Sequence, residues 1–236
     1  MMRKNNVIFA SLLMAAALCG CDDGSVPRKE YVITHSGLTA KLTGHITGAD
    51  SWPEYYQLVL AGFGESEYAV TQVLVSPDAD GNVTLTLTDI GSDVQTVELC
   101  VTNRLRRRVA TYRSLDVASA VGDTLYLDMG QVDADMYTAI QDHIFNSTCA
   151  QCHGLSTSAA AGLYLSEGHS YASLVNQPAT SVEGTRVIPG NADESVLHKV
   201  INPGNELNLG FSHEGMITSS TDLRLIDEWI NAGAKN

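Results

Sequence analysis

Two cysteines and an adjacent histidine in the C-terminal half of the chain have the spacing of a covalent cofactor site. The run Cys149-Ala150-Gln151-Cys152-His153 follows the pattern C-x-x-C-H. Two thiols at this spacing can both bond the vinyl edge of one porphyrin, and the adjacent histidine can then bind its iron. The sequence therefore predicts one covalent haem c on Cys149 and Cys152, with His153 as an axial ligand whose second ring nitrogen needs a hydrogen-bond acceptor.

Two other kinds of chemistry use a cysteine pair at this spacing. A thioredoxin-like redox pair should follow a strand inside a βαβ unit, and the sequence before Cys149 has no such pattern. A structural zinc site would need two further ligands from His169, His198 and His213, at spacings unlike those of common zinc modules. Haem is the favoured interpretation, and both alternatives stay open.

Helical periodicity is predicted before and after this motif. A first helix is expected from an N-cap at Asp133 up to Cys149, and a last helix from a cap at Ser219 or Ser220 until Gly233 ends it. The apolar residues at helical spacing are Tyr137, Ile140 and Ile144 in the first helix, and Leu223, Ile226 and Ile230 in the last. Between them the sequence indicates mostly loop, with one short helix over Ala192 to Ile201.

Several short motifs surround the cysteine pair in a fixed order. They are Phe145, Ala161-Gly162-Leu163-Tyr164-Leu165, Arg186-Val187-Ile188-Pro189-Gly190, Ser195-Val196-Leu197 and Trp229-Ile230-Asn231-Ala232-Gly233-Ala234. With these motifs, residues Asp133 to Ala234 resemble the small mono-haem cytochrome c domains of bacterial envelope proteins, including planctomycete-type cytochrome c. The resemblance implies an all-α cytochrome c fold for this part and does not cover the residues before it.

The resemblance also implies a second axial ligand. In that family a methionine shortly before the last helix, typically followed by proline, binds the iron, and Met216 stands at the matching position. Ile217 replaces the proline, and His213 is the alternative distal ligand. Arg186 could contact a haem propionate. A haem with both axial positions filled has no open site for a substrate, so we expect one-electron transfer rather than enzyme activity.

The residues before the haem motif have the alternation of β-strands. Apolar side chains alternate with threonine from Val83 to Thr88, and similar spacing recurs from Val97 to Val101. Further strands are predicted at Tyr56 to Leu60, Val70 to Val75 and Thr124 to Asp128. About seven short strands in about 100 residues are typical of an immunoglobulin-like β-sandwich. The predicted fold is therefore mixed, with a β-sandwich at residues 31–130 and an all-α haem domain at residues 131–236.

The N-terminal residues have the features of an exported bacterial lipoprotein. Arg3 and Lys4 precede an uncharged apolar run from Val7 to Leu18, which is shorter than the roughly 20 residues that span a bilayer. The segment Leu18-Cys19-Gly20-Cys21 resembles a lipobox, in which the last cysteine is acylated. We expect a signal peptide at residues 1–20 and a lipidated tether at residues 21–30, anchored to a membrane through Cys21.

Charge and the remaining cysteine limit the partners further. The formal net charge is −13, and it becomes −15 when residues 1–20 are removed with their two basic side chains. Such an acidic chain repels phosphate, so nucleic acid is not an expected partner. The expected partners are redox proteins of the cell envelope and, through the lipid, a membrane with the chain on its periplasmic side. Cys100 remains without an assigned role and is expected to be a free thiol.

Other functions fit parts of the sequence. The β-sandwich could bind a carbohydrate or an envelope protein through the aromatic residues Trp52, Tyr55 and Tyr56, with the haem domain in a sensing or accessory role. A haem with weak distal coordination could instead bind a gas. The run Arg104 to Arg108 could form a docking patch for an acidic partner, although a strand end or hairpin tip is the favoured interpretation.

Overall fold

The structure is a computed structural model that describes residues 37–154, 159–204, 207 and 209–236. The predicted signal peptide, the anchor Cys21 and the tether lie outside the described residues. The described residues belong to one compact unit, His35–Asn236. None of the described helices is long and apolar enough to cross a membrane. The expected domain boundary near residue 130 stays a prediction.

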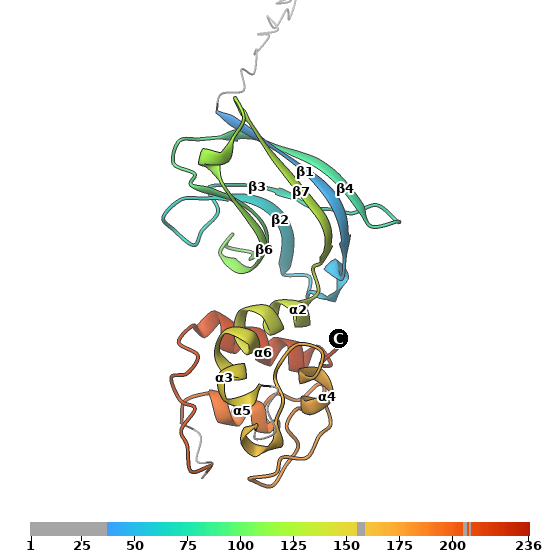
Figure 1. Cartoon of the computed structure of the whole chain (residues 1–236), viewed down its shortest axis with the longest axis vertical. Coiled ribbons are helices and arrows are strands. Elements are labelled where there is room, and N and C mark those ends of the chain that lie inside the picture. Colours follow the sequence, from blue (N-terminus) through green and yellow to red (C-terminus); the bar gives the residue numbers. More distant parts are fainter. Residues whose placement is uncertain (1–36, 155–158, 205–206, 208) are drawn as a thin grey trace, which may run out of the picture. The chain divides into compact units, whose positions relative to one another are not determined.

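Seven strands of the described chain form two sheets between residues 38 and 133 (Figure 1). One sheet has the order β4-β1-β7 and the other has the order β3-β2-β5-β6. Strand β1 pairs antiparallel with β4 and parallel with β7. The strands are β1 (Leu38–Thr47), β2 (Tyr56–Phe63), β3 (Thr71–Leu74), β4 (Asn82–Ile90), β5 (Thr96–Asn103), β6 (Arg108–Asp116) and β7 (Thr124–Asp133).

Alternation of apolar and polar residues explains which faces of the sheets are buried. In β4, Val83 and Leu87 are buried while Thr84 and Thr86 are exposed, as expected for a strand with one face on the core. Strands β2 and β5 are buried on both faces along most of their length. The second face of these two strands forms a small apolar cluster of its own, made of Val59, Ala61, Phe63, Ala69 and Cys100.

Cys100 is fully buried in this cluster as a free thiol. Burial raises the pKa of its thiol, so the reactive thiolate is scarce at neutral pH. The same strand carries Glu98, which is buried and accepts hydrogen bonds from Arg108 at 2.5 Å and from Thr111 at 2.8 Å. The guanidinium of Arg108 also lies over the ring of Phe63, 4.6 Å from its centroid. The run Arg104 to Arg108 lies at the hairpin between β5 and β6, as the favoured interpretation predicted. Two of its arginines form ion pairs within the chain, Arg107 with Glu67 and Arg108 with Glu98.

The state of Cys100 gives a testable prediction about the allocation of cysteines. In the folded, mature, haem-bearing protein we expect no thiol to react quickly with a thiol reagent, because Cys100 is buried and protonated. After denaturation we expect one reactive thiol per chain in a spectrophotometric thiol count. Three reactive thiols after denaturation would mean that Cys149 and Cys152 carry no thioether bonds, and none would mean that Cys100 is modified.

After β7 the chain forms only short helices. The longest is α6, with 12 residues. The described helices after β7 are α2 (Met136–Ile140), a π-helical segment η4 (Gln141–Cys149), α3 (Ala150–His153), α4 (Ser170–Leu174), α5 (Val196–Ile201) and α6 (Ser220–Asn231). Short 3-10 turns are η5 (Ala160–Gly162) in this part, and η2 (Ala49–Ser51) and η3 (Val117–Ser119) in the β region.

The predicted fold class, an immunoglobulin-like sandwich followed by an all-α cytochrome c fold, is wrong as a whole, although the seven strands expected in the N-terminal part are present and form two sheets. One of the two sheets contains a parallel pair of strands, β1 and β7, whereas both sheets of an immunoglobulin fold are antiparallel. The described residues after Asp133 contain a few short helices joined by irregular chain and no all-α cytochrome c domain. Glycines in the left-handed region, such as Gly184 and Gly190 with φ of +127° and +83°, direct this irregular path and are incompatible with continuous helix.

Two helices begin later in the sequence than predicted. Asp133 still belongs to β7, where it pairs with Thr47, and the cap of α2 is Asp135, which accepts hydrogen bonds from the backbone N–H groups of Tyr137 and Thr138. The short helix expected from Ala192 begins at Val196. Ser219 caps α6 as expected, through a hydrogen bond of 3.2 Å from the backbone of Asp222.

Aromatic side chains of the β region bind the backbone and side chains of the helical region. Trp52 Nε1 donates to the carbonyl oxygen of Ala134 at 2.8 Å. The hydroxyl of Tyr112 donates to the backbone carbonyl oxygen of Asp135 at 2.9 Å. The hydroxyl of Tyr56 donates to the carboxylate of Glu228 in α6. Trp52 and Tyr56, which the binding-module hypothesis needs on the surface, are therefore occupied in contacts within the chain.

Candidate cofactor site

The cysteine pair lies where the π-helical segment η4 runs into the four-residue helix α3. Cys149 is the last residue of η4, while Cys152 and His153 end α3. Cys149 is partly buried and Cys152 is exposed, and both are free thiols. Because α3 follows η4 without a break, the two thiols and the imidazole lie on one continuous helical segment. π-Helical segments are rare in proteins and occur frequently at functional sites.

Both cysteines and His153 line one cavity of about 470 Å³. This volume lies within the range of about 300–1,000 Å³ that is usual for small-molecule and cofactor sites. Most of the wall is aliphatic, with a few polar groups converging on it, which is the composition expected for a pocket that holds a large, flat, mainly apolar group. The aliphatic wall includes Leu163, Leu165, Leu174, Val200, Leu209 and Ile217.

One nitrogen of His153 is fixed by the backbone. Its Nδ1 lies 3.0 Å from the carbonyl oxygen of Ala160. Since a carbonyl oxygen only accepts hydrogen bonds, Nδ1 must carry the proton, and Nε2 of the neutral ring keeps its lone pair. The sequence-based requirement for an acceptor is thereby met, and the ring has the tautomer that a metal ligand needs.

The two candidates for a distal ligand, His213 and Met216, both line the cavity. The ring of His213 lies 6.1 Å from that of His153, centroid to centroid, with 22° between the planes. Burial, together with the nearby His153, lowers the pKa of His213, so its ring is neutral near pH 7. The side chain of Met216 is less enclosed, since 46% of the residue is exposed.

Arg186 lines the cavity, but backbone carbonyl groups already occupy its guanidinium. It donates to the carbonyl oxygen of Ser173 at 2.8 Å and to that of Ala161 at 3.0 Å. Burial lowers its pKa, without removing its charge at neutral pH. Arg186 therefore joins α4 to η5, and its possible contact with a propionate stays a prediction.

The thiol of Cys149 is not activated in the manner of a redox-active cysteine. Burial raises its pKa to about 11, whereas the attacking thiol of a thioredoxin-like pair has a pKa below the usual value. No strand–helix–strand unit surrounds it, since β7 is followed by α2 and η4 and no strand follows in the described residues. These observations disfavour the thiol-redox alternative.

This difference between the cysteines predicts their order of alkylation in haem-free protein. At pH 8 we expect iodoacetamide to modify the exposed Cys152 before the partly buried Cys149. Because the pKa of Cys149 is raised to about 11, its rate should keep rising as the pH increases from 8 towards 11. Peptide mass spectrometry over time measures both rates, and faster modification of Cys149 at pH 8 would contradict the described geometry.

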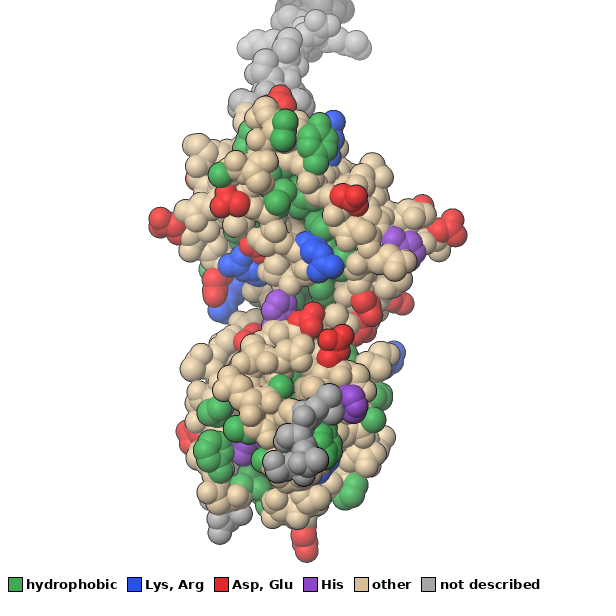
Figure 2. Space-filling view, in the orientation of Figure 1, with side chains coloured by type: hydrophobic (Ala, Val, Ile, Leu, Met, Phe, Trp, Pro, Cys, Tyr) green, Lys and Arg blue, Asp and Glu red, His purple; other side chains and the backbone are tan. Residues whose placement is uncertain are grey.

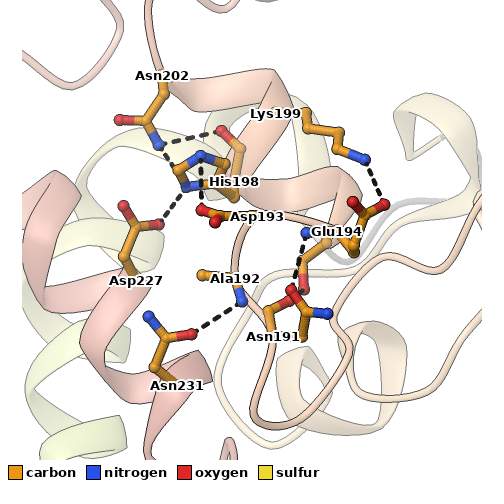
Figure 3. A network of polar contacts seen from close by, with 10 residues as sticks. Asn191, Ala192, Asp193, Glu194, His198, Lys199, Asn202, Asp227 and Asn231 are labelled. Atoms are coloured by element: carbon orange, nitrogen blue, oxygen red, sulfur yellow. Dashed lines mark hydrogen bonds and ion pairs between the residues drawn. The ribbon is translucent and has the colours of Figure 1, made fainter.

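The other histidines considered as ligands lie outside this cavity. The Nδ1 of His198 donates to the carboxylate of Asp227 at 2.7 Å and lies 3.0 Å from the amide nitrogen of Asn202 (Figure 3). In the same network Asn231 of α6 accepts a hydrogen bond from the backbone of Ala192 at 3.0 Å, so the network joins α5 and its preceding loop to α6. The Nδ1 of His169 contacts the carbonyl oxygen of Glu167. Within the described part of the chain, no group of three histidine, cysteine or acidic residues is arranged to hold a metal ion.

A buried polar network behind the cavity was not predicted from the sequence. Tyr137 and Ser170 share a hydrogen bond of 2.5 Å, and Ser170 bonds in turn to Gln141 of η4. Gln141 Nε2 then donates to the carbonyl oxygen of the cavity residue Leu165 at 3.0 Å. Three polar residues at separate places in the chain give no local pattern that would reveal this network. It fixes η4, and with it the cysteine pair, against the loop that forms the opposite wall.

Comparison of the chain with known protein families, with characterised proteins and with solved structures finds no match. The resemblance to planctomycete-type cytochrome c rests on the quoted motifs. Function is therefore argued from the residues of the cavity and from their chemistry.

Proposed function

We propose that this chain carries one covalent haem c on Cys149 and Cys152, and that it transfers single electrons in the bacterial cell envelope. A bound haem would supply an iron that changes its oxidation state by one electron. The observation that carries the proposal is the arrangement around His153. Its Nδ1 is bonded to the Ala160 carbonyl oxygen, its Nε2 is available as a ligand, and two thiols lie in the same apolar cavity wall.

The residues of the cavity fit such a group in their chemistry. Each thiol can add its S–H across one vinyl double bond, which forms a thioether and needs no oxidant. The aliphatic wall would exclude water from a porphyrin face, and Arg186 joins α4 to η5 beside it. The ring of His213 also lines the cavity, where its buried Nδ1 makes no hydrogen bond of standard geometry with the described residues and a backbone group of Phe211 interacts with the ring.

The proposed location rests on the N-terminal motif. We propose that a lipid on Cys21 holds the chain at the periplasmic side of a membrane. Acidic side chains are spread over the visible face, and basic side chains are visible as well, mainly on its upper part (Figure 2). A redox partner with a basic surface would be attracted to such a face, and the attraction should weaken as the salt concentration rises.

The proposal is tested by producing the full chain with and without the bacterial cytochrome c maturation machinery. We expect a haem-stained band on a denaturing gel only when the machinery is present, and acid acetone should leave that stain in place. A haem that acid acetone extracts, or a stoichiometric zinc ion in its place, would contradict the proposal. Reversible reduction of the stained protein by dithionite and reoxidation by ferricyanide would then test electron transfer itself.

A further inference from the structure

The imidazole rings of His153 and His213 approach each other inside the candidate cavity. The two residues belong to segments far apart in the sequence, α3 and the loop before α6, yet their ring centroids are 6.1 Å apart and their planes differ by only 22°. Both residues line the cavity. This separation of the ring centroids is too large for a direct hydrogen bond between the rings and too large for close stacking.

The separation matches that of two imidazoles bound to one metal ion. A metal–imidazole nitrogen bond is about 2.0 Å long, so two rings that bind one ion from opposite sides have their centres about 6 Å apart. The observed 6.1 Å agrees with this value.

His213 and Met216 differ in how far the cavity encloses them. The Nδ1 atom of His213 is buried and makes no hydrogen bond of standard geometry with the described residues, and a backbone group of Phe211 interacts with its ring. Buried polar atoms in folded proteins are almost always paired, so an atom without a well-formed hydrogen bond is a candidate for contact with an ion or ligand. The thioether sulfur of Met216 is only a weak acceptor, and this residue is 46% exposed.

We propose that His213, rather than Met216, is the distal iron ligand, which would make the haem bis-histidine. The inference rests on the proposed function, since it needs the haem on Cys149 and Cys152. It reverses the assignment that the sequence resemblance implies. Its consequence is a lower reduction potential than a histidine–methionine pair would give, because a thioether ligand raises the potential. Suitable partners would then be donors of correspondingly low potential.

The ligand is identified by spectroscopy of the full, matured protein. We expect the ferric wild type to be low-spin without the weak far-red absorption of a sulfur–iron bond, and Met216→Leu to leave this spectrum unchanged. His213→Ala should lose the low-spin spectrum and gain rapid carbon monoxide binding in the ferrous state, and added imidazole should restore the low-spin form. His169→Ala is the matched control, since its exposed ring lies outside the cavity.

Two results would overturn the inference. One is a far-red sulfur–iron band in the wild type that Met216→Leu removes, and the other is an unchanged low-spin spectrum in His213→Ala. Haem staining of the same samples separates this failure from that of the proposed function. A stained protein with methionine ligation refutes only the bis-histidine assignment, whereas a protein with no covalent haem refutes both. Rescue by imidazole shows that His213→Ala has retained its fold.

Discussion

Replacement of both Cys149 and Cys152 with alanine is expected to abolish the haem stain of the denatured chain. Each thiol supplies one of the two thioether bonds, so the double variant has no covalent link to the cofactor. Either single variant can still form one thioether bond, which survives denaturation, so it should keep part of the stain. The measurement is a haem-stained denaturing gel, normalised to the amount of protein.

Cys100→Ala is the matched control for these variants. Cys100 is a free thiol like the other two, but it lies in the separate apolar cluster between β2 and β5, away from the cavity. Its removal should leave the stain per chain unchanged, even if the smaller side chain lowers the free energy of unfolding by about 1–2 kcal/mol. A full stain in the double variant of Cys149 and Cys152 would show that the haem is attached elsewhere.

Cys21→Ser is expected to move the protein from the membrane fraction to the soluble fraction. An acylated N-terminal cysteine supplies several acyl chains, and loss of its thiol removes all of them at once. Haem attachment should persist, because Cys149 and Cys152 belong to the compact unit that begins at His35. Ultracentrifugation followed by immunoblotting and haem staining measures both outcomes in one sample.

Cys19→Ser provides the control for this second prediction. Cys19 precedes the predicted cleavage point and follows the bulky Leu18, so its thiol should leave with the signal peptide. The variant should stay in the membrane fraction. If the Cys21→Ser protein also stayed there after washing with high salt, another anchor would have to hold it.

Local sequence patterns predicted the elements that depend only on neighbouring residues or on one buried face. The alternation around Val83 and Leu87 identified β4, because one face of that strand lies on the core and the other on solvent. The Ser219 cap of α6 was identified because a cap depends on neighbouring residues alone. The Asp133 cap was wrong, since pairing with β1 extends β7 to that residue and local sequence does not record such a partner. The all-α fold was implied by the resemblance of residues 133–234 to cytochrome c domains, and it was wrong because the described residues of this part form a few short helices joined by irregular chain.

For the site, the sequence by itself determined the chemistry that a short segment can perform. Five consecutive residues contain the two thiols and the imidazole, so their proximity needs no tertiary structure. The fold decided what meets them: the Ala160 carbonyl that orients His153, the aliphatic walls, and His213 at 6.1 Å from His153. These groups arrive from segments separated by irregular, glycine-containing chain, whose path is set by packing against α6 and by the network around Gln141. Spacing along the sequence cannot encode that path, because no regular repeat relates one loop to the next.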